Sequence, residues 1–427
     1  MSTNGLLHLS PLQNLERTSP SVPEIKRLEE TIHQSLSGLA LDPARLRGKR
    51  IGVSCGSRGI ANLSDIVRAI CGWLKAQGAQ PFVFPAMGSH GGGTAEGQQG
   101  LLTEYGVTEK QIGAPVVSSM ETVVVGTTPE GIRSFMDANA WRADGVIVMN
   151  RVKPHTDFSG IIESGLLKMI AIGMGKEDGA RETHRWGRKF GPERVIRDAS
   201  ALALGSGKII AGLAVSENEF HQVAIVRAAR PEDFVRVEEA QLVEAKRLVP
   251  RPPFENLHVL VVDEMGKNIS GTGMDTKVIG RGASFPSHDR TDLRLIYVRD
   301  LTDASDGNAL GVGLADVIHD RLFRKIDFQK TYLNVRTSLN PPMAQTPMHF
   351  SSDLAALDFT LGSIGSPGED EQRVVWIRNT LNLNRMAVSK ALAREAAGLS
   401  GWRLSEGALT PGFDAAGDTT SPLAGSQ

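Results

Sequence analysis

The sequence predicts an α/β protein made of two domains, each built on a mostly parallel sheet. Short apolar runs of strand length alternate with segments of helical spacing up to about residue 250. This alternation is typical of β–α units around a parallel sheet. The same texture resumes after a proline-rich stretch, and a length of 427 residues fits two or three domains.

A stiff connector marks the expected domain boundary. The stretch VPRPPFEN contains Pro250, Pro252 and Pro253, and clustered prolines make a linker extended. We therefore expect residues 1–250 to form an N-terminal α/β domain and residues 254–397 to form a C-terminal one. The tail over residues 399–427 is rich in Gly, Ala, Ser and Thr, and this composition predicts disorder.

In the first domain, apolar runs predict buried strands that end in polar or glycine-rich loops. These strands are expected within Lys49–Gly59, Pro81–Gly93, Ala143–His155 and, as a pair, Lys208–Ala228. Segments with helical spacing fill the intervals, and Ser64 is the expected N-cap of one of them. The predicted helices are Val22–Leu36, Ser64–Gln77, Thr94–Tyr105, Ser164–Met174, Pro192–Leu204 and Pro231–Leu248.

The second domain shows the same texture with fewer clear elements. Buried strands are expected in Leu257–Gly266, Asp292–Leu301 and Val374–Leu383, and a helix in Gly313–Leu322. No internal repeat and no long low-complexity tract occurs in the chain.

Composition and charge argue against several classes of function. Hydrophobic residues make up 41% of the chain and charged residues 22%, as in ordinary globular proteins. The formal net charge is −1, so nothing indicates a nucleic-acid partner or an anionic membrane surface. No apolar run reaches the ~18–20 residues of a membrane span, and the N-terminus lacks a signal-peptide pattern. Cys55 and Cys71 make no disulfide framework, and we expect a cytoplasmic protein of undetermined oligomeric state.

Two loops of the first domain carry one side chain each that is suited to chemistry. In doubly wound sheets, ligands bind at the carboxyl ends of the strands, where these loops are expected. Arg58 in SCGSRGIANLSD offers a fork of donors to a carboxylate or phosphate, or is a surface arginine in a tight turn. His155 in MNRVKPHTDFSG is a proton carrier or metal ligand, or an ordinary hydrogen-bonding side chain.

A third loop, MGSHGGGTAEGQ, combines His90 with three consecutive glycines. Glycines let the backbone approach a ligand closely, and the helix opened by Thr94 favours anions at its N-terminus. The loop lacks the Lys-Ser/Thr of a P-loop and the spacing of a Rossmann turn. The alternative is a helix-capping turn with an incidental histidine.

Lys168 is the one charged residue in the apolar run LLKMIAIG. Three interpretations of this lysine are open. Its methylenes are buried while its ammonium stays in water, or it pairs with a carboxylate such as Glu163. In the third, it is a nucleophilic amine. His184 follows in a polar segment further along the chain and is otherwise an exposed histidine. No HxH, HxxxH or HExxH spacing occurs, so the sequence does not predict a preassembled zinc site.

The order of these residues resembles the nickel-pincer-nucleotide lactate racemase family, best over Lys49–Gly191. The resemblance rests on the arginine loop, the Gly-Ser-His-Gly-Gly-Gly loop and the order of His155, Lys168 and His184. A fainter likeness continues through GKNISGTGMDTKVIGR. The family implies two α/β domains with the active site in the cleft between them.

The resemblance also implies a cofactor and a role for each candidate residue. The cofactor is a nickel-pincer nucleotide, that is, Ni(II) with a pyridinium-3-thioamide-5-thiocarboxylic acid mononucleotide. Lys168 resembles the tethering lysine, His184 the nickel ligand, His90 and His155 the acid–base pair, and Arg58 the arginine that binds the substrate carboxylate. Cofactor contacts are expected from Gly91, Gly92, Thr94 and Ser159.

Departures from the lactate racemase pattern point to a different 2-hydroxy acid. The run IIE before Lys168 replaces a more glycine-rich one, and the His90 loop lacks a proline. Lys277 is the best candidate for the second-domain substrate lysine, with Lys267 as competitor. A polar pocket suited to an aldonate is expected from Ser89, Thr156, Asp157, Asn268 and Lys277.

These observations predict a racemase or epimerase that inverts C2 of a small-molecule 2-hydroxy acid, with no nucleic acid or membrane partner. Two other functions stay open on the sequence. One is an enzyme whose metal is held directly by His90, His155 and His184, with Lys168 structural. The other is a non-enzymatic anion- or nucleotide-binding module built on the glycine loop.

Overall fold

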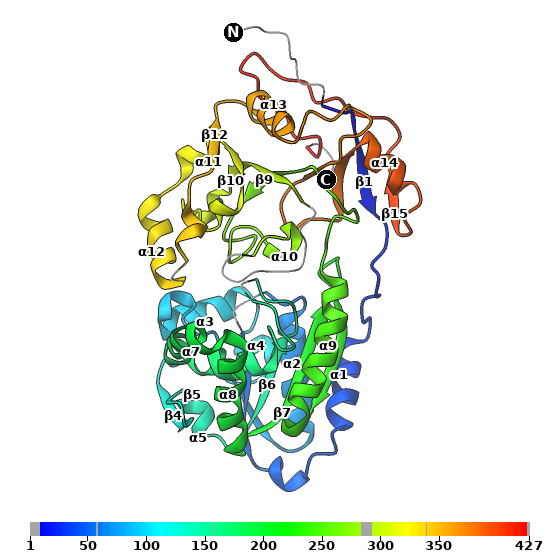
Figure 1. The fold of residues 1–427 in the computed structure, drawn as a ribbon. Coiled ribbons are helices and arrows are strands. Elements are labelled where there is room, and N and C mark those ends of the chain that lie inside the picture. Colours follow the sequence, from blue (N-terminus) through cyan, green and yellow to red (C-terminus); the bar gives the residue numbers. More distant parts are fainter. Residues whose placement is uncertain (1–8, 57–58, 157, 283–292, 339, 425–427) are drawn as a thin grey trace. The chain divides into compact units, whose positions relative to one another are not determined.

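The structure is a computed structural model and describes all residues except 1–8, 57–58, 157, 283–292, 339 and 425–427. The chain divides into two compact units, whose elements are labelled in Figure 1. The N-terminal unit is Val22–Leu248, and the C-terminal unit combines the described residues up to Ser21 with those from Val249 onward. Each unit is an α/β structure around its own sheet, as the sequence predicts.

The N-terminal unit is built on a five-stranded sheet in the order β3-β2-β6-β7-β8. All neighbouring strands are parallel except β7 and β8, which form an antiparallel pair. The parallel strands need helical crossovers between them, and the chain supplies these in sequence order. The bounds are β2 Arg50–Cys55, β3 Gln80–Pro85, β6 Gly145–Arg151, β7 Ile209–Glu217 and β8 Val223–Ala229.

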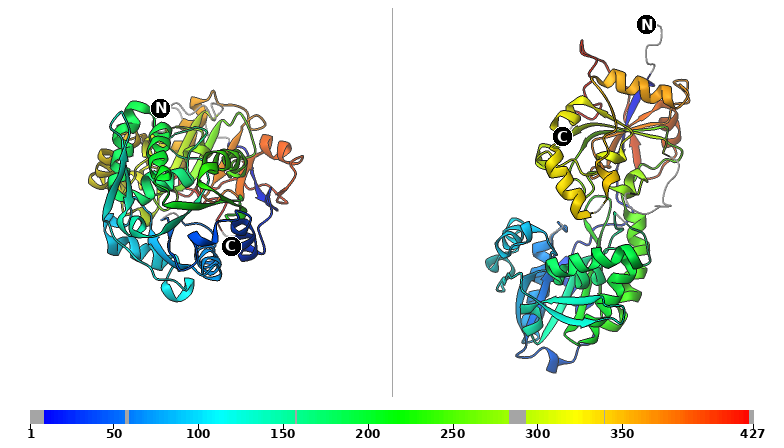
Figure 2. Two further views of the ribbon diagram at one scale, coloured as in Figure 1. Left: turned by 90° about the horizontal axis from the view of Figure 1, so that it is seen from below. Right: turned by 60° about the vertical axis from the view of Figure 1, so that its left-hand side comes forward.

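Helices cover both faces of this sheet, because its strands are apolar on both sides (Figures 1 and 2). In β6, Ile147 and Met149 face one core while Val146 and Val148 face the other, as the two-residue period of a strand requires. The first core lies against α1 Leu28–Ser37 and α2 Leu63–Ala76. The second lies against α8 Pro192–Gly205 and α9 Phe234–Leu248.

The segment between β3 and β6 carries smaller elements that the sequence did not predict, apart from its first helix. That helix, α3, spans Ala95–Glu104, and an antiparallel hairpin of β4 Thr122–Thr127 and β5 Arg133–Asp137 packs against later helices. Short helices α4 Glu109–Ile112 and α5 Ala138–Arg142 complete this segment.

After β6 the chain runs through a loop into an unusual helical stretch. It begins as α6 Leu166–Lys168, continues as a π-helical segment over Met169–Met174, and becomes α7 Lys176–Phe190. The sequence predicts one ordinary helix over Ser164–Met174 and no long helix after it. The π-helical geometry and the full-length α7 are findings of the structure, and π-helical turns occur frequently at functional sites.

The C-terminal unit is built on an eight-stranded sheet in the order β12-β11-β10-β9-β13-β14-β1-β15. The strands from β12 to β13 are parallel, and those from β13 to β15 are antiparallel. The bounds are β1 Leu12–Arg17, β9 Val259–Met265, β10 Leu295–Leu301, β11 Val317–His319, β12 Met348–Phe350, β13 Val374–Ile377, β14 Arg385–Ser389 and β15 Trp402–Leu404.

Helices again cover both faces of this sheet. One core includes side chains of α10 Thr276–Ile279, α11 Asp320–Lys325 and α14 Lys390–Ala396. The opposite core includes side chains of α13 Asp353–Ser363. Helix α12 spans Phe328–Ser338. In the part of the chain that the structure describes, no helix has the length and apolarity that crossing a bilayer demands.

Two expectations about chain organisation need correction. The described residues up to Ser21 belong to the C-terminal unit and not to a 1–250 domain, because β1 pairs with β14 and β15. The tail expected to be disordered contains β15, and Asp418 and Thr419 make hydrogen bonds to side chains of the C-terminal unit. Both errors come from contacts between residues far apart in sequence, which local composition does not reveal.

Two local expectations also differ from the structure. The range Gly313–Leu322 is not one helix, since it holds strand β11 and only the start of α11. Ser64 lies inside α2, where its hydroxyl donates to the carbonyl of Gly106, and Asn62 stands at the N-cap. Thr94, in contrast, caps α3 through its side chain, at 3.1 Å from the amide nitrogen of Gly97.

Candidate functional site

The candidate residues of the N-terminal unit follow neighbouring parallel strands. Strands β3, β2 and β6 are adjacent, so the loops that leave their carboxyl ends lie along one edge of the sheet. His90 follows β3 and His155 follows β6. Arg58 follows β2 but lies outside the described residues, as does Asp157.

The glycine loop has a backbone that only glycine adopts easily. Gly91, Gly92 and Gly93 have φ values of 66°, 68° and 67°, all in the left-handed region. A Cβ added to Gly92 would meet no atom within 4 Å, so the backbone there faces open space. His90 precedes the glycines with an exposed side chain, and Thr94 follows them as the helix cap.

The side chain of a buried glutamine is hydrogen-bonded to this loop. Gln98 is fully buried on α3, and its side-chain amide donates to the carbonyls of Gly88 and His90 at 2.9 and 3.2 Å. Its oxygen accepts from the ammonium of Lys176 at 3.4 Å. The two carbonyls that flank the His90 turn are therefore tied to a fixed side chain of the interior.

His155 lies in a loop that a buried carboxylate holds. The carboxylate of Glu163 is fully buried and accepts from the amides of His155 and Gly160 at 2.7 and 3.1 Å. Lys246 of α9 pairs with the same carboxylate at 2.7 Å. The imidazole of His155, which is half-buried, stacks on Phe158 with ring centres 4.4 Å apart. Backbone and ring are thus both restrained.

Lys168 is half-buried at the end of α6, between buried apolar neighbours. Two further side chains hold its short helix at the carbonyls. Asn150, from the end of β6, donates to the carbonyl of Gly165 at 2.7 Å. Ser200 of α8 donates to the carbonyl of Leu167 at 2.8 Å. The helix that carries Lys168 is therefore fixed by neighbours on two other elements.

A third contact to this helix comes from Glu238 of α9. Its fully buried carboxylate accepts from the amide of Leu167 at 3.0 Å. Burial raises the pKa of Glu238 to about 7, and the backbone donors of Leu167 and Leu166 oppose that rise. A Cβ on Gly165 would lie 2.3 Å from the carboxyl carbon, so only glycine allows this close approach.

The glycine loop and the Lys168 segment touch through their backbones. The amide of Gly88 donates to the carbonyl of Gly173, in the π-helical segment, at 3.2 Å. His184 lies further along, exposed on α7. The structure thus joins the His90 loop directly to the stretch between Lys168 and His184.

Lys176 is a buried lysine that the sequence analysis did not single out. It is fully buried at the start of α7 and pairs with Asp137 at 3.0 Å. It also donates to the carbonyl of Pro85 and to Gln98. Burial lowers the pKa of Lys176, and the Asp137 carboxylate opposes this. Because two oxygens accept from Lys176 and the carboxylate of Asp137 balances its charge, Lys176 is a structural cation and not a nucleophile.

Ser159 and Lys277 were the remaining candidates. Ser159 is exposed in the loop between His155 and Glu163. Lys277 is buried on α10 of the C-terminal unit, where Asp275 caps the helix and accepts from the Lys277 amide at 2.9 Å. The competitor Lys267 donates to the carbonyl of Gly271 and to Asn334, at 2.6 and 2.9 Å.

Within the described residues, one group has metal-ligand spacing: His319, Asp353 and Asp418 of the C-terminal unit. The potential ligand atoms of this group already make hydrogen bonds or ion pairs within the protein. Nδ1 of His319 accepts from the amide of Arg321, so its Nε2 carries the proton that goes to Asp418. Arg299 and Arg321 both bind Asp353, and two guanidinium groups repel a cation. This cluster is an ion-pair network and not a metal site.

The cysteines are unsuited to binding a metal. Both are fully buried and free, and burial raises the pKa of Cys55 and Cys71 to about 12. Burial therefore disfavours the thiolate form at both positions.

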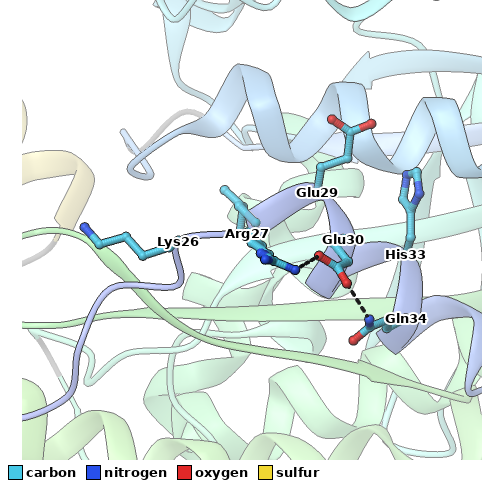
Figure 3. Close-up of a pocket in the computed structure, with 7 residues that line it drawn as sticks. Lys26, Arg27, Glu29, Glu30, His33 and Gln34 are labelled. Atoms are coloured by element: carbon cyan, nitrogen blue, oxygen red, sulfur yellow. Dashed lines mark hydrogen bonds and ion pairs between the residues drawn. The ribbon is translucent and has the colours of Figure 1, made fainter.

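A surface depression of about 580 Å³ lies away from these residues (Figure 3). It is lined by α1 and the residues just before it, from Lys26 to Gln34. The charged side chains engage one another along the helix, with Glu30 contacting Arg27 and Gln34 at 3.3 and 3.1 Å. Its lining includes none of the candidate residues that the structure describes, so it is no substrate pocket for them.

The fold is similar to that of a solved racemase. The structure of the lactate racemase apoprotein from Thermoanaerobacterium thermosaccharolyticum matches with a TM-score of 0.50 at 12% sequence identity. The match covers 86% of this chain and 94% of that one. At this identity the likeness establishes a lactate racemase-like fold and nothing finer.

A second solved structure, of a protein from Thermotoga maritima, gives a TM-score of 0.46 at 17% identity. It covers 64% of this chain and 70% of that one, and so low a score carries no conclusion. No protein-family model matches the sequence, and no curated protein matches it either.

The structure therefore places His90 and His155 after strands of the same sheet, connects the His90 loop to the segment that follows Lys168, and identifies partners that the sequence does not reveal. His90, His155 and Lys168 lie on segments that Gln98, Glu163 and Glu238 anchor. A signal for these anchors exists in the sequence, since each is a long polar residue on the apolar face of a helix or between apolar neighbours. Their partners were not predictable, because the pairings depend on how separate elements pack.

Proposed function

We propose that the chain is a racemase or epimerase that inverts C2 of a 2-hydroxy acid with a nickel-pincer nucleotide. Lys168 would hold the cofactor covalently and His184 would ligate nickel. His90 and His155 would act as the acid–base pair. The lactate racemase-like fold, matched over most of both chains, supports this assignment.

One observation carries the proposal: the hydrogen bond between Gly88 and Gly173 at 3.2 Å. It ties the loop of His90 to the segment that separates Lys168 from His184. An amine, an imidazole ligand and an acid–base imidazole are then carried by directly connected pieces of backbone. If Lys168, His184 and His90 had no common function, their segments would not need to be hydrogen-bonded to one another.

The residues present fit the implied cofactor. The amine of Lys168 is half-buried on a helix whose position three side chains fix. Joining it in a thioamide would remove the positive charge from this apolar stretch, which lowers the cost of burial. His184 is exposed, and the backbone at Gly92 faces open space, so a bound group would have room beside the glycine loop.

When bound, the nickel-pincer nucleotide supplies an acceptor and donor of hydride for the substrate carbon. The chain supplies the rest. One of His90 and His155 would take the hydroxyl proton of the substrate at a ring nitrogen, and the other would return a proton to the carbonyl oxygen of the planar 2-keto acid, whose C2 takes back the hydride on its opposite face. Two bases on different loops allow both enantiomers to react.

The substrate would be a polyhydroxylated acid such as an aldonate. Ser89 and Thr156, the described residues of the N-terminal unit that are expected to contact the substrate, are polar, which suits hydroxyl groups along a longer chain. Arg58 would bind the substrate carboxylate. Lactate turning over much faster than gluconate-like acids would remove this part of the proposal.

The proposal is tested with protein from a host that makes the cofactor. Intact-mass spectrometry should detect an adduct that Lys168→Ala abolishes and the surface control Lys189→Met retains. Nickel content should fall in His184→Ala. His90→Ala and His155→Ala should keep the adduct but lose interconversion of enantiomers, followed by chiral chromatography over a panel of 2-hydroxy acids.

Two outcomes would replace the proposal. Stoichiometric metal without any adduct would favour direct ligation by histidines, with Lys168 structural. Nucleotide binding that survives all three histidine substitutions, without turnover, would favour a binding module built on the glycine loop.

A further inference from the structure

The feature of interest is a buried polar cluster beneath the glycine loop, formed by Gln98, Lys176 and Asp137. We propose that Gln98, oriented by Lys176, is a positioning residue that sets the His90 loop against the segment following Lys168. Its catalytic consequence rests on the proposed function, whereas its structural part does not.

The burial of the Gln98 side chain is not explained by apolar packing. On α3 only Gln98 and Leu102 are buried, and Gln98 is fully so. A buried amide is costly unless every polar atom finds a partner. Here both donors and the acceptor are engaged, by Gly88, His90 and Lys176. The side chain therefore serves the loop and not the apolar core.

Lys176 collects acceptors from three separate elements. They are Pro85 at the end of β3, Gln98 on α3 and Asp137 at the end of β5. The residue also adopts φ 54°, a left-handed conformation that is unfavourable for lysine. Such a conformation persists where surrounding contacts determine it, and these three contacts do so.

Lys176 also determines which end of the Gln98 side-chain amide faces the loop. The two ends of a glutamine amide have the same shape and opposite roles in hydrogen bonding. An ammonium only donates, so Lys176 binds the oxygen of Gln98 and not its nitrogen. The nitrogen is then directed toward the loop, where two carbonyls accept from it. Lys176 thereby fixes the orientation that lets Gln98 hold the loop.

The glycine loop depends on the two hydrogen bonds from Gln98 for its order. Three successive glycines lose more backbone entropy on ordering than any other residues would. The loop is also tied by the contact of Gly88 with Gly173 and by weak turns such as Gly93 to His90 at 3.3 Å. Removing the two Gln98 donors leaves the carbonyls at Gly88 and His90 without this interior partner.

The structural part is tested by Gln98→Glu, which keeps an oxygen for Lys176 and removes both donors. We expect amide hydrogen exchange at His90, Gly93 and Thr94 to accelerate by about tenfold or more in cofactor-free protein, because the loop opens more readily. The matched control Gln99→Glu, exposed on the same helix, should leave that exchange unchanged. Exchange equal to that of the unsubstituted protein would overturn the proposal.

A second variant covers the case in which Gln98→Glu does not fold. Gln98→Asn keeps the amide but shortens the side chain by one methylene, so it cannot span Lys176 and both carbonyls together. The same acceleration is expected, with an unchanged circular dichroism spectrum. Unchanged exchange in a folded Gln98→Asn protein would likewise overturn the proposal.

The catalytic part is tested with cofactor-loaded protein. In a Gln98 variant with a loosened loop, kcat should fall by about tenfold or more while KM and the Lys168 adduct mass stay unchanged, because only His90 loses its position. A loosened loop with unchanged kcat would overturn the role of Gln98 in catalysis. If unsubstituted protein racemises no acid, the proposed function fails, and the exchange result still decides whether Gln98 holds the loop.

Discussion

The side chains at the carboxyl ends of the parallel strands differ between the two sheets in their pairing and exposure. In the C-terminal unit, Asp263, Arg299 and His319 lie toward the ends of β9, β10 and β11, and nearby segments of the same unit engage all three. Arg299 pairs with Asp263 and Asp353, and Asp418 of the tail binds His319 at 2.9 Å. In the N-terminal unit, the same edge carries an exposed His90 and a half-buried His155.

This difference teaches which edge is available for chemistry. In the C-terminal unit, charged groups satisfy one another, so the cluster stabilises the fold. In the N-terminal unit, the buried side chains of Gln98, Glu163 and Glu238 each hydrogen-bond to backbone groups of the candidate segments. The side chain of His90 is exposed, and that of His155 is half-buried against Phe158. Substitutions at the two edges should therefore differ in their effects on stability and on activity.

The largest effect on stability is expected at Asp353. Its carboxylate is fully buried and accepts from Tyr297, Arg299 and Arg321 at 2.6–2.9 Å. Burial alone would raise its pKa, but the hydrogen bonds from Arg299 and Tyr297 hold the pKa of Asp353 well below its usual range. Asp353→Ala leaves buried Arg299 with Asp263 as its remaining acidic partner, removes the acceptor of the Tyr297 hydroxyl, and should cost about 3–5 kcal/mol in the free energy of unfolding, measured in urea.

The control for this prediction is Asp358→Ala on the same helix. Asp358 is exposed, so the change should stay within about 0.5 kcal/mol. If Asp353→Ala also cost less than about 1 kcal/mol, the network would not be the stabilising feature of this edge.

The sequence predicts the α/β architecture more accurately than it predicts the contacts of the buried residues Gln98, Glu163 and Glu238. Alternating apolar runs identify the parallel strands β2, β3 and β6, because burial on both faces leaves a local signature. The glycine loop and Lys168 are visible for the same reason, as breaks in a local pattern. Glu163 and Lys246, by contrast, lie far apart in the sequence, and their pairing depends on how α9 packs.

The same reasoning explains the errors in the C-terminal unit. Strand β1 is short and lies near the start of the chain, yet it pairs with β14, which lies near the other end. The tail from Asp414 has a disordered composition, yet Asp418 finds a histidine and an arginine at the sheet edge. Local propensity cannot include contacts made by single residues at such separations.

The second-largest effect is a pH dependence at Glu238. Its pKa is raised from 4.5 to about 7 by burial, so the folded protein holds the proton more tightly than the unfolded chain. The contribution of this group to stability is therefore full below pH 4.5 and is lost as the pH rises to about 7. Relative to Glu238→Gln, unsubstituted protein should lose about 3 kcal/mol of unfolding free energy across this window.

Urea titrations at a series of pH values measure this difference. Glu239→Gln, exposed beside Glu238 on α9, is the matched control and should follow the unsubstituted protein at every pH. Parallel pH profiles for Glu238→Gln and the unsubstituted protein would show that Glu238 is not a buried acid in solution.

A smaller effect is expected in the tail. Asp418 is one-third exposed and binds His319, while its oxygen also accepts from the amide of Asp353 at 3.1 Å. Asp418→Ala should lower the free energy of unfolding by about 1–2 kcal/mol, since charged hydrogen bonds at a half-exposed site contribute this much. Glu406→Ala, exposed in the same tail, should have no measurable effect. Equal effects of the two substitutions would mean that the tail does not close this edge.

The smallest effect on stability is expected at His90, and this contrast is the most informative. His90 is exposed, and its backbone, which Gln98 holds, is retained in His90→Ala. The free energy of unfolding should therefore change by less than about 0.5 kcal/mol, measured beside the exposed control Gln99→Ala. If the proposed chemistry is right, enantiomer interconversion should nevertheless fall by about a hundredfold or more in His90→Ala alone. A large loss of stability would instead place His90 among the structural groups, as His319 is at the other sheet.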